Sequence, residues 1–298
     1  MKAEKRPVAE KPVAVLSNND GCVVARSNEV KALGIPMGIP LFKVRDIVAN
    51  NKVQLLSAHF ELYGDISQRI VQLLREETPL IEVYSIDENF IDLSEMPVDD
   101  LEAWARRVRE RILHEIGIPT SVGVAPTKTL AKVASTFAKT RGDGTWVIDS
   151  DEQRQEMLEQ LPIEDIWGIG RKLAPKLHDL GISKASQLIN ASDAWLRTQF
   201  NIGGLKMVDE LRGVARLPFG DKREQRKTIM RSRSFGHRVR DYFQLESAVA
   251  TFAAQAASRL RSQDSICSGI VVSLQLAERE GGYKRFISRF VRLSEPSA

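Results

Sequence analysis

The sequence predicts an α+β protein built from several domains. Its 298 residues are 43% hydrophobic and 28% charged, which is ordinary for a globular chain of two domains or three small ones. Strand and helix patterns alternate up to about residue 161, which favours an α+β unit with a mainly antiparallel sheet. Residues 162–216 have no strand pattern and predict a helical unit, and a mixed pattern returns after about residue 225.

The first elements are a short strand and a long helix. Residues 12–16 form an apolar run that ends in Ser-Asn-Asn-Asp-Gly, which is typical of a strand leading into a turn. Residues 32–40 contain two glycines and two prolines, so we expect no regular element there. Apolar residues at helical spacing from Phe60 to Leu74 predict a helix that Pro79 closes.

An acidic step interrupts the next apolar run. Strand-forming residues stand on both sides of Asp87 and Glu88, which predicts two short strands that meet at a turn. Carboxylates held close together on sheet backbone can bind the Mg²⁺ ions of two-metal phosphoryl transfer. Asp-Glu-Asn is also ordinary solvated turn chemistry, and this segment on its own favours the turn.

The remaining elements follow from periodicity and capping. An amphipathic helix is expected from Leu101 to Ile116, ended by Gly117, and Thr127 can cap a helix that starts at Lys128. The other predicted elements are a strand at 120–124, the helix at 128–139, a helix at 248–260 and a strand at 268–276.

Charge and cysteine content restrict the class of protein. The net charge is +4, and residues 222–240 hold eight Lys or Arg against one acid, which permits a polyanionic partner. Cys22 and Cys267 are far apart and the four histidines are scattered, so the sequence predicts neither a disulfide framework nor a zinc site and fits a reducing cytosol. No apolar run is long enough to span a membrane, and the charged N-terminus is unlike a secretory signal.

A glycine-containing hairpin opens the helical unit. Gly168 and Gly170 flank one apolar residue, and Arg171 and Lys172 follow directly. Free backbone N–H groups in such a hairpin favour a nucleic-acid phosphate, although the same hairpin can serve packing alone. The basic residues favour phosphate binding.

Lysines near predicted turns are candidate triphosphate ligands. Lys128 and Lys132 lie one helical turn apart, where they can meet phosphate oxygens or form a solvated helix face. Lys31 and Arg26 are equally ambiguous when each is taken singly.

The order of these motifs resembles the Y family of translesion DNA polymerases, and within it the UmuC subfamily. The motifs that carry the resemblance are KPVAVLSNNDGCVVARS at 11–27, KALGIPMG at 31–38, YSIDE at 84–88, APTKTLAK at 125–132, IWGIGR at 166–171 and RSRSFG at 231–236. The resemblance covers about residues 6–275.

The resemblance implies a right-hand polymerase of palm, fingers, helix-hairpin-helix thumb and partial little finger. It implies fingers at 1–58, the rest of the fingers and the palm at 59–161, a thumb at 162–227 and part of the little finger at 228–298. The implied activity is error-prone DNA synthesis past lesions in the SOS response, and the alternative is a catalytically impaired DNA-binding remnant.

The resemblance also implies residue roles and partners. Asp87 and Glu88 would bind Mg²⁺, and Lys31 and Lys128 would contact the incoming dNTP. The implied partners are primer–template DNA, a UmuD-type subunit, the RecA filament and a sliding clamp, in the bacterial cytoplasm at the nucleoid. The residues implied to contact DNA are Gly168, Gly170, Arg171, Lys172, Arg231 and Arg233.

The sequence departs from the family pattern at both ends. Family members begin with a strand that carries a third acidic metal ligand and a helix with an aromatic residue that screens the nucleotide sugar. Residues 1–5 contain only Glu4 as an acid, so we expect both features to lack a counterpart. The last basic stretch, from about 278, is not expected to match the family.

Overall fold

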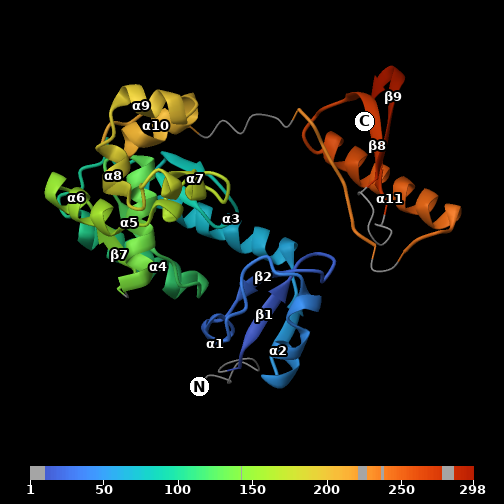
Figure 1. The fold of residues 1–298 in the computed structure, drawn as a ribbon, viewed down its shortest axis with the longest axis horizontal. Coiled ribbons are helices and arrows are strands. Elements are labelled where there is room, and N and C mark those ends of the chain that lie inside the picture. Colours follow the sequence, from blue (N-terminus) through green and yellow to red (C-terminus); the bar gives the residue numbers. More distant parts are fainter. Residues whose placement is uncertain (1–10, 142, 221–226, 236–237, 277–284) are drawn as a thin grey trace. The chain divides into compact units, whose positions relative to one another are not determined.

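The structure is a computed structural model that describes residues 11–141, 143–220, 227–235, 238–276 and 285–298 (Figure 1). The chain divides into two compact units, one made of Met1–His59 with Arg223–Ala298 and the other of Phe60–Lys222. The finer division into four domains that the sequence suggests stays a prediction.

Residues 11–59 fold around a three-stranded sheet. The central strand β1 (Val13–Leu16) pairs antiparallel with β2 (Val23–Arg26) and parallel with β3 (Gln54–Ser57). The short helices α1 (Asn28–Ala32), η1 (Leu41–Lys43) and α2 (Arg45–Asn50) accompany the sheet, and a small apolar core lies between them. The predicted strand at 12–16 is confirmed, and of residues 32–40, expected to form no regular element, Ala32 alone belongs to a helix, as the last residue of α1.

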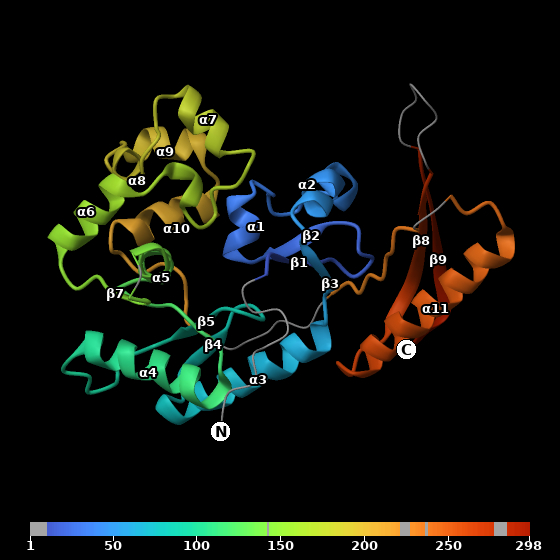
Figure 2. The same ribbon diagram turned by 90° about the horizontal axis from the view of Figure 1, so that it is seen from below.

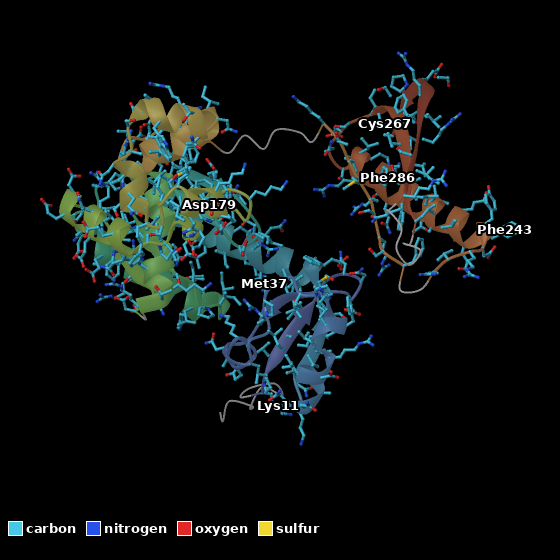
Figure 3. The ribbon with its side chains drawn as sticks, in the orientation of Figure 1. Lys11, Met37, Asp179, Phe243, Cys267 and Phe286 are labelled. Atoms are coloured by element: carbon cyan, nitrogen blue, oxygen red, sulfur yellow. The ribbon has the colours of Figure 1, made fainter. Side chains whose placement is uncertain are left out.

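The C-terminal part of the chain contains one long helix and a two-stranded antiparallel sheet. These are α11 (Tyr242–Arg261), β8 (Cys267–Gln275) and β9 (Phe286–Ser297). The predicted helix at 248–260 and strand at 268–276 are confirmed, whereas β9 lies where no element was expected. Large apolar side chains stay open to solvent here, among them Phe243 at 74% and Phe286 at 65% exposure (Figure 3).

The first half of the second unit packs small sheets against helices. Its elements are α3 (Phe60–Glu77), β4 (Ile81–Val83), β5 (Asn89–Ile91), α4 (Leu101–Ile116), β6 (Val122–Val124), α5 (Lys128–Arg141) and β7 (Thr145–Val147). The helices α3 and α4 pack side by side (Figure 2), and a core cluster joins them to β4, β5 and β6. Gly117 ends α4 in the left-handed conformation, with φ at 79°, as expected of a helix C-cap.

The sheets are less antiparallel than the sequence predicts. The strands β4 and β5 pair antiparallel, but β6 and β7 are parallel and are connected through α5. A parallel pair needs such a crossover helix, and three-residue strands are too short to display a sequence period. The strand β7 was therefore not expected. Gly123 of β6 lies so close to α5 that an added Cβ would be 2.1 Å from the Ser135 amide nitrogen.

A cluster of ion pairs around Glu77 joins α3 to α4. The Glu77 side chain, only 8% exposed, pairs with Arg107 and Arg111, each at 2.8 Å. Burial alone raises the pKa of Glu77, but hydrogen bonds from Arg111 and Arg107 outweigh it, so the pKa lies below its usual value. The charged form of Glu77 thus stabilises the packing of α3 against α4.

The second half of this unit is helical, as predicted for residues 162–216. Apart from an isolated bridge between Pro162 and Lys184, these residues form no β-structure. The elements of this helical segment are α6 (Asp151–Gln160), η2 (Ile163–Asp165), α7 (Ala174–Asp179), α8 (Ala185–Ile189), α9 (Asp193–Gln199) and α10 (Ile202–Leu211).

Among the helices of the described residues, none combines the length and apolar character that a membrane crossing requires.

One hydrophobic core extends across the two halves of the second unit. Its buried members include Leu130 and Val133 of α5, Leu158 of α6 and Leu188 and Leu211 of the later helices. The helix α5 therefore belongs to the same core as the helical segment that follows it.

Candidate functional site

The acidic step lies in the turn between two paired strands, as the sequence predicts. Residues 81–83 pair antiparallel with residues 89–91, and Asp87 and Glu88 directly precede β5. The amides of Tyr84 and Ser85 both donate to the Glu88 carbonyl oxygen, at 3.1 and 3.0 Å, and close the turn. The Asp87 side chain is exposed and accepts a 2.7 Å hydrogen bond from the Ser85 hydroxyl.

Two lysines of α5 approach this hairpin on one helix face. The Nζ of Lys132 pairs with Glu88 Oε1. The Nζ of Lys128 lies 2.6 Å from Glu82 Oε2 and 2.6 Å from the Pro218 carbonyl oxygen. The structure therefore brings Lys128 to the acidic hairpin, where its direct partner is Glu82 of β4 rather than Asp87 or Glu88.

Aromatic rings surround the two ammonium groups. The rings of Tyr84 and Trp167 meet edge to face at 5.2 Å, and the Trp167 indole N–H donates to the Tyr84 hydroxyl at 3.3 Å. The Lys132 Nζ lies 5.5 Å from each of these ring centroids, and the Lys128 Nζ lies 5.4 Å from that of Phe90. These contacts join the acidic hairpin, α5 and the start of the glycine hairpin into one site.

The glycine hairpin contains one glycine in the left-handed region of backbone conformation. Gly168 has φ at 99°, which favours glycine, and no atom lies within 4 Å of a Cβ added at Gly170. Ile169 between them is buried at 4% exposure, whereas Arg171 and Lys172 are exposed. The buried side chain of Ile169 thus anchors the hairpin in the core, while the basic residues that follow it face solvent.

The other residues proposed from the sequence lie in the first unit. Lys31 is exposed on α1, and its Nζ donates to Asn28 Oδ1 at 3.1 Å. Arg231 and Arg233 are exposed in a segment without helix or strand. Residues 1–10, where Glu4 lies, and residues 221–226 and 236–237, with part of the basic stretch, are outside the described residues.

The donor chemistry of the acidic hairpin fits a hard divalent cation. Asp87 and Glu88 offer carboxylate oxygens, the donors that Mg²⁺ takes one or two at a time together with substrate phosphates. Asp92, just after β5, accepts hydrogen bonds from the hydroxyl and the amide of Ser94, which lower its pKa. Within the described part of the chain, no group of three or more Asp, Glu, His or Cys residues could hold a metal.

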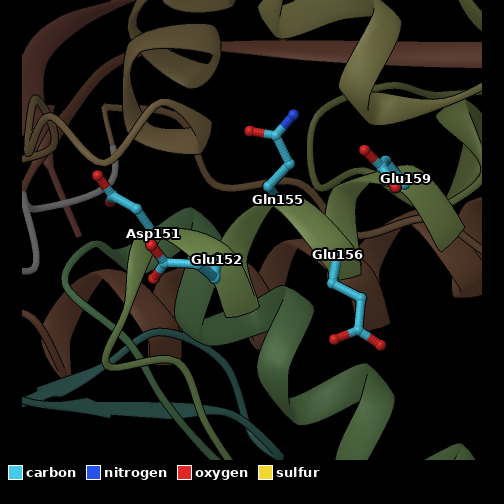
Figure 4. Close-up of a pocket in the computed structure, with 5 residues that line it drawn as sticks. All are labelled: Asp151, Glu152, Gln155, Glu156 and Glu159. Carbon is cyan, nitrogen blue, oxygen red and sulfur yellow. The ribbon is translucent and has the colours of Figure 1, made fainter.

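A surface hollow on α6 is a poor candidate for the site. It has a volume of about 370 Å³ and is lined only by side chains of that helix (Figure 4). Four of these side chains are acidic, and acidic side chains repel nucleic-acid phosphates. The lining residues are Asp151, Glu152, Gln155, Glu156 and Glu159.

Two features of the site were missed by sequence reasoning. Glu82 alternates with apolar residues in a three-residue strand, where nothing distinguishes it from a solvated position. The Trp167–Tyr84 contact joins residues 83 positions apart, and no local pattern predicts it.

Three family models match most of the chain. The impB/mucB/samB family matches residues 1–136, the IMS family HHH motif matches 151–182, and the impB/mucB/samB family C-terminal domain matches 226–298. The matches reach both ends of the chain. They correct the expectation that the resemblance covers only about residues 6–275.

Curated relatives agree with these matches. Protein UmuC of Salmonella typhimurium (strain LT2) is 39% identical over 288 residues, which are 95% of this chain and 64% of that protein. Protein ImpB of Salmonella typhimurium is 40% identical and covers 86% of this chain and 62% of its own length. DNA polymerase IV 1 of Bacillus subtilis (strain 168) is 30% identical, covering 96% of this chain and 68% of that protein. The chain spans just under two thirds of the length of the first two relatives.

Solved structures establish the fold. A Y-family DNA polymerase chimera, Dbh-Dpo4(243-245)-Dbh, superimposes with a TM-score of 0.74 at 24% identity, covering 97% of this chain and 82% of that one. DinB from Sulfolobus solfataricus superimposes with a TM-score of 0.63 at 24% identity, with the same coverage. The predicted right-hand polymerase fold is therefore confirmed. The chain belongs to the impB/mucB/samB family and is a UmuC-type member of the Y-family DNA polymerases.

Proposed function

We propose that this chain carries out error-prone, DNA-directed DNA synthesis past lesions, as part of the SOS response to DNA damage. The observation that carries the proposal is the acidic hairpin with two lysines of α5 beside it. Asp87 and Glu88 supply carboxylate oxygens, and Lys128 and Lys132 supply positive charge within the same site. Negative charge develops on phosphoryl oxygens during nucleotide transfer, and such an arrangement suits that chemistry.

In this proposal the carboxylates of Asp87 and Glu88 hold Mg²⁺. When bound, Mg²⁺ would supply the positive charge that phosphoryl transfer requires. The Ser85 hydroxyl, which donates to Asp87, orients one of the two carboxylates. Lys132 pairs with Glu88 beside the turn.

Lys31 and Lys128 contact the triphosphate of the incoming dNTP. A lysine ammonium acts on phosphate oxygens as a point charge and does not need the fixed geometry of arginine. Lys128 is mostly buried, with 11% of its side chain exposed, so its charge is little screened by water. We add Lys132 to this set, because its Nζ is already beside Glu88.

The glycine hairpin and the basic residues beyond it bind the DNA backbone. The hairpin at Gly168 and Gly170 is exposed, so a DNA phosphate can approach its backbone closely. Arg171 and Lys172 add positive charge next to it. Arg231 and Arg233, both exposed, are two further residues that would contact the DNA. These contacts position the primer–template without reading its sequence.

We also propose the partners and the location that this activity requires. The substrates are primer–template DNA and dNTPs, and the regulatory partners are a UmuD-type subunit, the RecA filament and a sliding clamp. The chain would act in the bacterial cytoplasm at the nucleoid. Its relatives include Protein UmuC and two proteins called MucB, and this similarity supports the proposal.

A second function is a DNA-binding remnant with impaired catalysis. One observation favours it: within the described residues, the acidic hairpin has no third carboxylate close enough to complete a metal cluster. Two-metal transfer relies on carboxylates shared between ions, so a missing one reduces catalysis more than binding.

Primer extension distinguishes the two functions. The unmodified chain, the variant Asp87→Ala and the control Glu159→Gln are each supplied with primed DNA, dNTPs and Mg²⁺. Extension by the unmodified chain and the control, lost in Asp87→Ala, supports the polymerase. Salt-sensitive binding to primed DNA with no extension by any of the three overturns it and supports the remnant.

A further inference from the structure

A buried carboxylate lies at the end of α10, away from the acidic hairpin. Among the described residues, Glu210 is the one charged residue that is fully buried, with 0% exposure. An isolated carboxylate in an apolar interior is costly unless donors surround it, so such a residue needs a structural explanation. The proposed mechanism assigns it no role.

Four donors satisfy this carboxylate, and they come from two different segments. Its Oε2 accepts from the Thr129 amide at 3.0 Å and from the Thr129 hydroxyl at 3.2 Å. Its Oε1 accepts from the amides of Arg216 and Leu217 at 2.7 and 2.9 Å. The side chain therefore bridges the first turn of α5 to the backbone at 216–217.

The main chain of the same residue reinforces the bridge. The Thr127 hydroxyl donates to the Glu210 carbonyl oxygen at 2.9 Å, and it also accepts from the Leu130 amide as the cap of α5. Thr127 and Thr129 are themselves buried, at 5% and 0% exposure. Water therefore competes little for these hydrogen bonds, and a buried network of this kind is sensitive to the loss of one member.

The bridged segment returns to the acidic hairpin. Pro218 O accepts from Lys128 Nζ at 2.6 Å, and the Gly220 amide donates to Glu82 Oε2 at 3.0 Å. The ring of Phe219 lies 5.0 Å from the Lys128 ammonium. Residues 216–220 are thus held at one end by Glu210 and at the other by Lys128 and Glu82.

We propose that Glu210 is a positioning residue for Lys128. Its carboxylate fixes the start of α5 and the segment 216–220 against each other, and these are the two elements that hold the Lys128 ammonium beside Glu82. The relevance of this position to nucleotide transfer rests on the proposed polymerase function. The role of Glu210 in holding Lys128 in place does not depend on that function.

The variant Glu210→Gln tests the proposal with little change in volume. Glutamine has one acceptor oxygen and an NH₂ group that only donates, so one pair of donors loses its acceptor whichever way the amide turns. Thr129→Val is a milder variant that removes one of the four hydrogen bonds and keeps the side-chain volume. Glu159→Gln, on the exposed face of α6, is the matched control.

Lysine acylation followed by mass spectrometry reads out the position of Lys128 without any need for activity. We expect Glu210→Gln to raise the acylation rate of Lys128 by roughly threefold or more, as expected of a local opening, with a smaller rise in Thr129→Val. The rate at the exposed Lys172 should not change in any variant. If Glu210→Gln does not fold, Thr129→Val decides the question. An unchanged rate at Lys128 in the folded variants, even with a lowered melting temperature, would overturn the proposal.

Steady-state primer extension separates this inference from the proposed function. In an active polymerase, Glu210→Gln should raise KM for dNTP more than it lowers kcat, because Lys128 would contact the substrate before chemistry. If no variant and no unmodified chain extends a primer but the acylation of Lys128 still rises, the positioning role stands and the polymerase proposal fails.

Discussion

The ammonium of Lys132 is paired with the carboxylate of Glu88. This pair places a protein cation directly on one of the two acids proposed to bind metal. A divalent ion and an ammonium cannot both take the same carboxylate oxygens at full strength. In the proposed reaction cycle Lys132 therefore pairs with Glu88 while no metal is bound. When metal and nucleotide are bound, it contacts phosphate oxygens instead.

This competition can be measured on the lysine. Adding Mg²⁺ should raise the acylation rate of Lys132 about two- to fivefold, because a partly exposed ion pair contributes up to about 1 kcal/mol. The variant Glu88→Gln should have the higher rate already and should not respond to Mg²⁺. A rate at Lys132 that Mg²⁺ leaves unchanged in the unmodified chain would contradict the competition.

The glycine hairpin should dominate the salt dependence of DNA binding. The double variant Arg171→Gln with Lys172→Gln removes both positive charges. It should reduce the slope of log K against log salt concentration by about 2, one unit for each lost phosphate contact. Fluorescence anisotropy of primed DNA at several salt concentrations measures the slope. Lys139→Gln, an exposed lysine on α5, is the control. An unaltered slope in the double variant would leave the hairpin with a packing role only.

Substitution by alanine should have very different effects on stability at two glycines. A Cβ at Gly123 would meet the Ser135 amide at 2.1 Å and the Ala131 carbonyl at 2.4 Å, both rigid backbone of α5. We expect Gly123→Ala to reduce the free energy of unfolding by about 3 kcal/mol or more. Gly170→Ala meets nothing within 4 Å and should change it by less than about 0.5 kcal/mol. Urea denaturation followed by circular dichroism measures both, and equal losses would contradict the packing of β6 on α5.

The ion pairs of Glu77 should make stability depend on pH. Its pKa is lowered in the folded chain, so the stabilisation is fully present above the unfolded value of about 4.3 and is lost as pH falls through the lower folded value. Glu77→Gln should therefore lower the free energy of unfolding by about 2 kcal/mol at pH 7. The difference from the unmodified chain should shrink below about pH 4.

Urea titrations at several pH values test this expectation, with Glu159→Gln as the control for the substitution itself. A difference between Glu77→Gln and the unmodified chain that stays constant down to pH 3 would show that the pairs with Arg107 and Arg111 do not stabilise the charged form.

Sequence patterns predict the longer elements of this protein well. The helices α3 and α4 have a clear apolar period, and Gly117 and Thr127 mark helix ends through their own backbone and side-chain chemistry. The acidic hairpin is predicted because apolar strand residues flank a polar turn on both sides. In each case the signal is local, so the sequence alone is sufficient.

The missed features depend on contacts between distant residues. The strand β7 becomes a strand by pairing with β6 across α5, and three residues are too few to display alternation. The bridge from Glu210 to Thr129 spans 81 positions, and nothing in the sequence around Glu210 distinguishes a buried glutamate from an exposed one. Lys128 was predicted to face a nucleotide, but only the tertiary structure gives Glu82 as its partner.

The hydrophobic core that runs from α5 through α10 has a consequence for building chimeric polymerases. An exchange that replaced residues 162–222 alone would cut through this core and separate Glu210 from Thr129. A graft that also carries α5 would keep both sets of contacts. The smallest transferable module that includes the glycine hairpin should therefore begin before residue 127, and shorter grafts should be recovered as insoluble or protease-sensitive chains.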